Sequence, residues 1–159
     1  MGRPTALLLA LPLVALVAGC GGGDVIRGER LAKMVDPHGG AHAIWVTRAN
    51  RICAERAAAV RKLQAPSTRN ELIDAGARIV AAENLEYSRL AELRPPVQDR
   101  REVGAFLGSV QQVPREIERV RGALKLRNAA DLAGARAALA AARRDANARA
   151  RRLGLTCRH

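Results

Sequence analysis

The chain has 159 residues, 48% of them hydrophobic, which fits a single domain with a core of its own. Its 27 basic residues exceed its 15 acidic ones, and the formal charge of +12 favours anionic surfaces. The only aromatic residues are Trp45, Tyr87 and Phe106, too few for the stacking platforms that bind single-stranded nucleic acid, so we expect no nucleic-acid partner.

The first 19 residues have the pattern of a secretory signal peptide. Arg3 gives the start a positive charge, and an almost entirely apolar run follows over residues 5–18. This run is shorter than the ~20 apolar residues that a transmembrane helix needs. We therefore expect residues 1–19 to direct export and then to be removed.

The end of this leader, Val17-Ala18-Gly19-Cys20, resembles the lipobox of bacterial lipoproteins. The resemblance implies that the sulfur of Cys20 receives a diacylglycerol, that the bond between Gly19 and Cys20 is cleaved, and that the new amino terminus is acylated. Two or more acyl chains would anchor the protein stably in the cell membrane, with the chain exposed on the extracytoplasmic side. The alternative is an ordinary signal peptide in which the cysteine is incidental.

Residues 20–40 are predicted to form the lipidated N-terminus and a linker. Gly21-Gly22-Gly23 is typical of a flexible tether, and Asp36-Pro37-His38-Gly39-Gly40 contains several residues that interrupt helices. The domain is therefore expected to span residues 41–159.

After the linker, apolar residues recur at steps of three and four, which predicts helices throughout. The first helix is predicted over residues 41–64. The second is predicted over residues 68–93, where Thr68 and Glu71 have the spacing of a capping box. Pro95-Pro96 closes this second helix, because the residue before a proline is disfavoured in the helical conformation.

The third helix has the most regular pattern, a heptad seam of apolar residues from Val103 to Leu124. Pro114 lies off that seam, which places it on the outer face. Asn128 is the predicted N-cap of the fourth helix. That helix should end at Gly154 in the left-handed conformation, with Leu155 folding back on the last turn.

Four helices with short connections predict an all-α fold, an antiparallel up-down-up-down four-helix bundle in which the first and fourth helices are neighbours. Lipidation of Cys20 would leave Cys53 and Cys157 as a pair in a compartment where disulfides persist. We therefore predict one disulfide that ties the C-terminal tail to the first helix. Two free thiols are the alternative.

Three short motifs in the domain are similar to those of a known group of proteins. They are Ala49-Asn50-Arg51-Ile52-Cys53, Leu93-Arg94-Pro95-Pro96 and Leu153-Gly154-Leu155-Thr156-Cys157. Together they resemble a group of small secreted or lipid-anchored helical proteins of high-GC actinobacteria. The resemblance implies a helical fold and a cysteine pair, and it implies no activity.

Glu83 falls where the apolar face of the second helix is expected. We expect its carboxylate to flank the core and reach water, because glutamate is rarely fully buried. The alternative is a functional carboxylate with a raised pKa, part of a ligand site in the bundle core near Pro114.

The sequence has no recognisable catalytic or phosphate-binding motif, and we expect neither enzymatic activity nor a cofactor. No metal site is expected either. His38 and His42 are four residues apart, but two glycines lie between them. Cys157 and His159 would be free to bind a metal only without the disulfide, and a structural zinc site needs four ligands.

The expected function is therefore a non-catalytic binding or structural module in the cell envelope. Its partner would be an anionic lipid, a cell-wall polymer or a protein. A small-molecule sensor or carrier is the alternative, followed by an enzyme without a recognisable motif. The basic excess has a second interpretation. It would form a solvated surface with ion pairs such as Glu86–Arg89 and Glu118–Arg121.

Overall fold

The computed structural model describes residues 37–159, with side-chain burial from residue 40 onward. The predicted signal peptide, the cleavage site at Gly19 and Cys20, and the linker up to residue 36 lie outside the described residues. In the described part of the chain, no helix is both long and apolar enough to cross a membrane.

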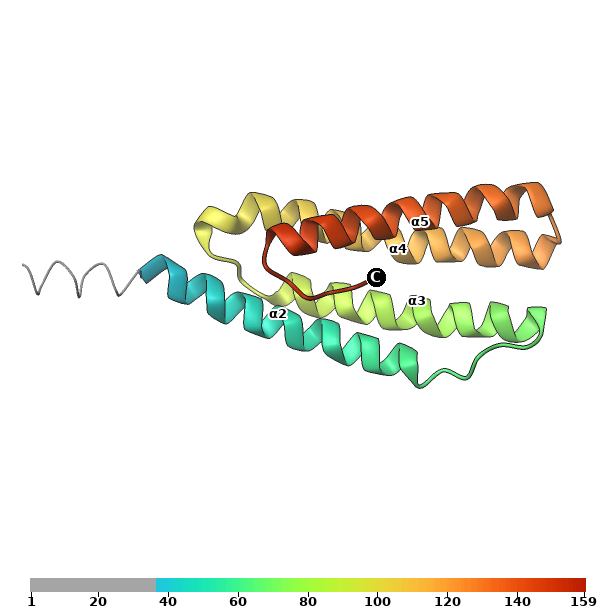
Figure 1. Ribbon diagram of the computed structural model, residues 1–159, viewed down its shortest axis with the longest axis horizontal. Coiled ribbons are helices and arrows are strands. Elements are labelled where there is room, and N and C mark those ends of the chain that lie inside the picture. Colours follow the sequence, from blue (N-terminus) through green and yellow to red (C-terminus); the bar gives the residue numbers. More distant parts are fainter. Residues whose placement is uncertain (1–36) are drawn as a thin grey trace, which may run out of the picture. The chain divides into compact units, whose positions relative to one another are not determined.

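Four long helices and one short 3-10 helix make up this domain. They are α2 (Pro37–Arg61), α3 (Arg69–Glu92), η1 (Val97–Asp99), α4 (Arg100–Leu126) and α5 (Ala129–Arg152). Each long helix packs against the next one along the chain, and short loops reverse the direction between them (Figure 1). The predicted all-α, antiparallel four-helix bundle is confirmed.

Helix α2 begins four residues earlier than predicted. Pro37 is its first residue, and Gly39 and Gly40 continue it, so the expectation that residues 37–40 belong to the linker is wrong. A proline suits the first helical position, because an N–H there would have no partner inside the helix. The two glycines therefore do not separate His38 from His42 by a loop, and Nδ1 of His42 lies 2.8 Å from Oδ2 of Asp99.

The helix ends follow the predicted local signals. Thr68 and Glu71 form the capping box of α3, and the side chain of Asn128 accepts hydrogen bonds from the first turn of α5. Gly154 has a φ of 72°, and the N–H of Leu155 donates to the carbonyl of Ala150 at 2.9 Å. This is the geometry of a Schellman motif, which turns the chain back toward the bundle.

The predicted seam of α4 forms much of the core. Its buried members are Val103, Phe106, Val110, Val113, Ile117 and Leu124. Pro114 is also buried, so its predicted place on the outer face is wrong. The helix continues through this proline, and the buried face of α4 is wider than a two-residue heptad seam.

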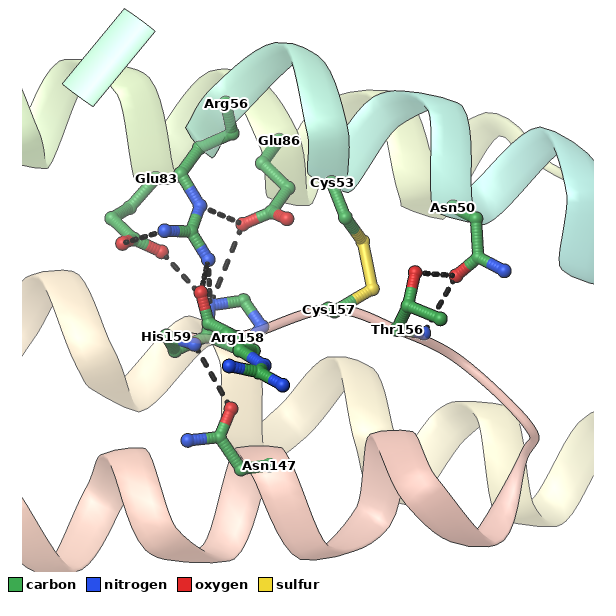
Figure 2. Close-up of a disulfide and its surroundings, with 10 residues drawn as sticks. All are labelled: Asn50, Cys53, Arg56, Glu83, Glu86, Asn147, Thr156, Cys157, Arg158 and His159. Atoms are coloured by element: carbon green, nitrogen blue, oxygen red, sulfur yellow. Dashed lines mark hydrogen bonds and ion pairs between the residues drawn. A yellow bond between two sulfur atoms is a disulfide. The ribbon is translucent and has the colours of Figure 1, made fainter. Parts of the chain in front are cut away.

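The C-terminal tail, residues 153–159, replaces the predicted contact between the first and fourth helices. After the Schellman motif it runs back between α2 and α5, as Figures 1 and 2 show. Leu153, Leu155 and Cys157 are each at most 5% exposed and belong to the same apolar cluster as Trp45 and Phe106. The tail thus fills the space that direct helix packing was expected to fill.

Candidate functional site

A disulfide joins Cys53 of α2 to Cys157 of the tail, with a Cα–Cα distance of 5.2 Å. Both residues are buried, at 4% exposure each. The predicted pairing is confirmed, and it closes a loop across 104 positions of sequence. Disulfides form and persist in oxidising compartments outside the cytoplasm, so this bond is consistent with an extracytoplasmic domain.

Two asparagines hold the backbone of the tail on either side of the disulfide (Figure 2). Oδ1 of Asn50, on α2, accepts a hydrogen bond from the N–H of Thr156 at 2.8 Å. Oδ1 of Asn147, on α5, accepts one from the N–H of His159 at 2.9 Å. The tail is therefore bonded to both helices between which it lies.

A charged cluster of four residues, Arg56, Glu83, Glu86 and His159, lies beyond the disulfide (Figure 2). Nε of Arg56 lies 3.2 Å from Oε2 of Glu86, and its Nη1 lies 3.7 Å from Oε1 of Glu83. Nδ1 of His159 lies 3.2 Å from Oε2 of Glu83. The side chains of both glutamates are at most 2% exposed, so the cluster is part of the interior.

Burial raises the pKa of both carboxylates, but their neighbours oppose it to different extents. For Glu86, burial is the largest influence and raises the pKa from its ordinary value of 4.5 to about 7, against the opposing charges of His159 and Arg56. Burial would also raise the pKa of Glu83, but the hydrogen bond to His159 and the charges of Arg56, His159 and Arg143 outweigh it and lower that pKa. The expectation that Glu83 reaches water is wrong, and the raised pKa belongs to Glu86.

The cluster brings three metal-ligating side chains together, since ligand atoms of Glu83, Glu86 and His159 lie within 4.8 Å of one another. The guanidinium of Arg56 already supplies positive charge to both carboxylates. Buried charges are stable when they are paired and hydrogen-bonded in this way. We therefore describe the cluster as an ion-pair network that holds the tail, α2 and α3 together.

The structure does not bring Glu83 and Pro114 into one ligand site. Pro114 lines a shallow hollow of about 190 Å³ together with Asn84 and Gln111, among others. Successive residues of a helix point about 100° apart, so Asn84 faces this hollow while Glu83 faces the tail. The predicted ligand site in the core is therefore wrong, because Glu83 lies in the charged cluster and Pro114 lies at a separate hollow.

An apolar groove, which we call the end groove, opens where α2 stops. Helix α2 ends at Arg61, while α3, α4 and α5 continue toward the far end of the bundle (Figure 1). The groove has a volume of about 310 Å³, and its lining is mostly aliphatic. The larger apolar side chains there include Leu63, Leu72, Ile79, Ile117, Leu124 and Leu139.

Two arginines give the end groove its charge. Arg121 of α4 and Arg143 of α5 line it, and the lining formed by the described residues includes no acidic side chain. Nε of Arg121 donates to the carbonyl of Ile73 at 2.9 Å, and its side chain pairs with Glu118 outside the groove. A Cβ on Gly76 would lie 2.8 Å from Cδ of Arg121, so the glycine leaves room for that side chain to cross α3.

A larger recess of about 610 Å³ lies beside the loop between α2 and α3. Its charged lining residues are Lys62, Glu71, Asp74 and Arg78, two of each sign. This recess favours neither an apolar nor a charged ligand. The end groove is therefore the better candidate for binding.

Of the two surface ion pairs predicted from sequence, one is correct. Glu118 pairs with Arg121, but Glu86 is buried, and Arg89 pairs with Glu55 of α2 instead. Sequence reasoning also missed Arg56 and His159 as members of the charged cluster.

Comparisons of this chain with protein families, with curated proteins and with solved structures found no match.

Proposed function

We propose that this chain is a lipid-anchored protein of a bacterial cell envelope whose helical domain is a non-catalytic module that binds a small ligand. The end groove is the observation on which this proposal depends. Ligand pockets are concave, mostly apolar and about 300–1,000 Å³ in volume. The end groove meets all three criteria.

The charged cluster fits a structural role better than a catalytic one. Its carboxylates contact Arg56 and His159, and the tail that supplies His159 is bound by the disulfide and by Asn147. A catalytic acid or base needs a route to its substrate and freedom to exchange a proton. These buried pairs instead connect α2, α3 and the tail.

The proposed anchor is the lipid on Cys20, supported by the lipobox-like residues 17–20 and by the disulfide of the domain. The basic excess of the chain supports an anionic partner in the envelope, such as a phospholipid or a wall polymer. Cleavage after Gly19 would remove only Arg3 among the basic residues, so this excess remains in the anchored protein.

The anchor is tested in a bacterium that processes lipoproteins, with a clickable palmitate analogue as the label. The full chain should take up the label and sediment with membranes, and Cys20→Ala should take up no label. Cys53→Ala/Cys157→Ala is the matched control, because it removes cysteines that are not lipidated and should still label. Labelling of Cys20→Ala would show that the anchor is elsewhere.

The binding role is tested on the non-lipidated mature chain, residues 21–159 exported behind a cleavable leader. The neutral apolar dye N-phenyl-1-naphthylamine should become fluorescent in the end groove. Ala75→Phe, which fills the groove, should abolish the signal, and Ala81→Phe, on the exposed surface of the same helix, should not. An equal signal from both variants would place the dye elsewhere and contradict the proposal.

A further inference from the structure

The end groove is chemically asymmetric, and this asymmetry indicates the class of its ligand. Its aliphatic floor would cover an apolar chain, because removing apolar surface from water favours binding. Among the described residues that line it, Arg121 and Arg143 are the charged ones. An occupant that is apolar at one end and negative at the other would match both parts.

Arg143 is the less satisfied of the two arginines. Within the described part of the chain it has no acidic partner at ion-pair distance, although its charge lowers the pKa of Glu83, and its buried Nε has no hydrogen-bond partner. An arginine side chain has five N–H donors and no acceptor, so each hydrogen bond that it forms needs an acceptor on a neighbour or a ligand. Arg143 lines the groove, so a carboxylate or phosphate oxygen of a bound ligand would supply an acceptor for its guanidinium.

Arg121 is held in place and reinforces the same charge. Its Nε is bonded to the carbonyl of Ile73, and Gly76 leaves space for its aliphatic stem. Glu118 pairs with Arg121, whereas Arg143 has no ion pair among the described residues, so Arg143 is the guanidinium left for an anionic group. A cationic ligand would be repelled there, and a neutral one would leave Arg143 unpaired.

We propose that the end groove binds an amphiphile with a single apolar chain and an anionic head group, with Arg143 as the residue that binds the head. This inference rests on the proposed function, because it specifies the ligand of the same groove. Guanidinium groups bind carboxylates and phosphates in a two-pronged geometry, which makes arginine well suited to such a head.

The test is displacement of N-phenyl-1-naphthylamine from the non-lipidated mature chain by three ten-carbon ligands. These are decanoate, decanol and decylammonium, which share an apolar chain and differ in head charge. We expect decanoate to displace the dye at a concentration at least ~10-fold lower than decanol does, a difference of about 1.4 kcal/mol. Decylammonium should be the weakest of the three.

The variants assign this preference to one side chain. Arg143→Met should bring decanoate and decanol to equal potency, while the dye itself still binds. Arg143→Lys retains the charge and should retain part of the preference. Arg144→Met is the matched control, because it removes an exposed arginine from the adjacent position of α5 and should leave the preference unchanged.

Each possible failure has a distinct meaning. Equal displacement by decanoate and decanol in the unmodified chain would overturn the inference about the head group and leave the proposed binding role in place. A preference that survives in folded Arg143→Met would also overturn it, because the head would then be bound elsewhere. Absence of any dye signal would remove the proposed function together with this inference.

Discussion

Nδ1 of His159 lies 3.2 Å from Oε2 of Glu83, although 76 positions of sequence separate the two residues. The imidazole is fully buried and also lies near the ring of Phe106, with 6.4 Å between ring centroids. The tail is therefore an integral part of the core. It joins α3 to α2 and α5 in the place where a packed helix pair was expected.

Removing the disulfide should strongly destabilise the domain. In the chain-entropy model, a cross-link that closes a loop of about 100 residues contributes up to ~4.7 kcal/mol. The Cys53→Ala/Cys157→Ala variant should therefore unfold at a clearly lower urea concentration than the unmodified chain. Dithiothreitol should lower the midpoint of the unmodified chain and leave that of the variant unchanged. Identical midpoints for both proteins in oxidising buffer would contradict a stabilising role.

Arg56→Met tests whether the charged cluster is a balanced network. The variant leaves two buried carboxylates without their guanidinium partner, and breaking a buried pair in this way typically costs ~3–5 kcal/mol. Adding Glu83→Gln should recover part of this loss, because it removes one unpaired charge. Arg51→Met, at an exposed position of the same helix, should change the free energy of unfolding by less than ~0.5 kcal/mol. Equal effects of Arg56→Met and Arg51→Met would show that the cluster contributes nothing.

Glu86 should make the domain less stable as pH rises from about 5 to 8. Burial raises its folded-state pKa from 4.5 to about 7, so the folded chain binds this proton more tightly than the unfolded chain does. The resulting stabilisation is fully present below the unfolded pKa and is lost as pH rises through about 7. Glu83 acts in the opposite sense and at lower pH, because its folded-state pKa is lowered.

Urea unfolding at several pH values distinguishes these contributions. Glu86→Gln should flatten the decline between pH 5 and 8, since it cannot ionise beside Glu83, Arg56 and His159. Glu92→Gln, at an exposed position near the end of the same helix, should keep the decline of the unmodified chain. If Glu86→Gln keeps it as well, another group is responsible for the pH dependence.

The helices and their caps could be predicted from sequence because their signals lie within a few neighbouring residues. The cysteine pair could be predicted because lipidation of Cys20 would leave two cysteines. Thr68 with Glu71, Asn128, and Gly154 with Leu155 each specify a helix end within a few residues. The start of α2 was misjudged because glycines after a proline resemble a loop, although the proline itself suits the first helical turn.

The charged cluster and the end groove could not be predicted in the same way. A charged residue on a helix has the same sequence pattern whether it reaches water or meets a distant partner, and 103 positions separate Arg56 from His159. One signal was present, since Glu83 and Glu86 are three residues apart on one helical face. The groove depends on α2 ending at Arg61 beside longer helices, which requires the tertiary arrangement.

Two residues in the left-handed conformation provide a paired test of backbone strain. Arg127 ends α4 with a φ of 55°, and Gly154 follows α5 with a φ of 72°. Only glycine adopts this conformation without a steric cost from Cβ. Arg127→Gly should therefore raise the free energy of unfolding by ~0.5–1 kcal/mol, because the side chain is exposed and little packing is lost. Gly154→Ala should lower it by ~1 kcal/mol or more, although nothing in the described structure lies within 4 Å of the added Cβ.

The same measurement has a matched control in Leu126→Ala, one position before Arg127 at the exposed end of α4. Alanine there keeps the helical conformation, so the free energy of unfolding should change by less than ~0.5 kcal/mol. If Arg127→Gly lowers stability, the strain at that turn is smaller than the entropy that glycine adds to the unfolded chain. If Gly154→Ala is neutral, the Schellman turn adjusts its φ at little cost, and the tail is held by the disulfide and the charged cluster instead.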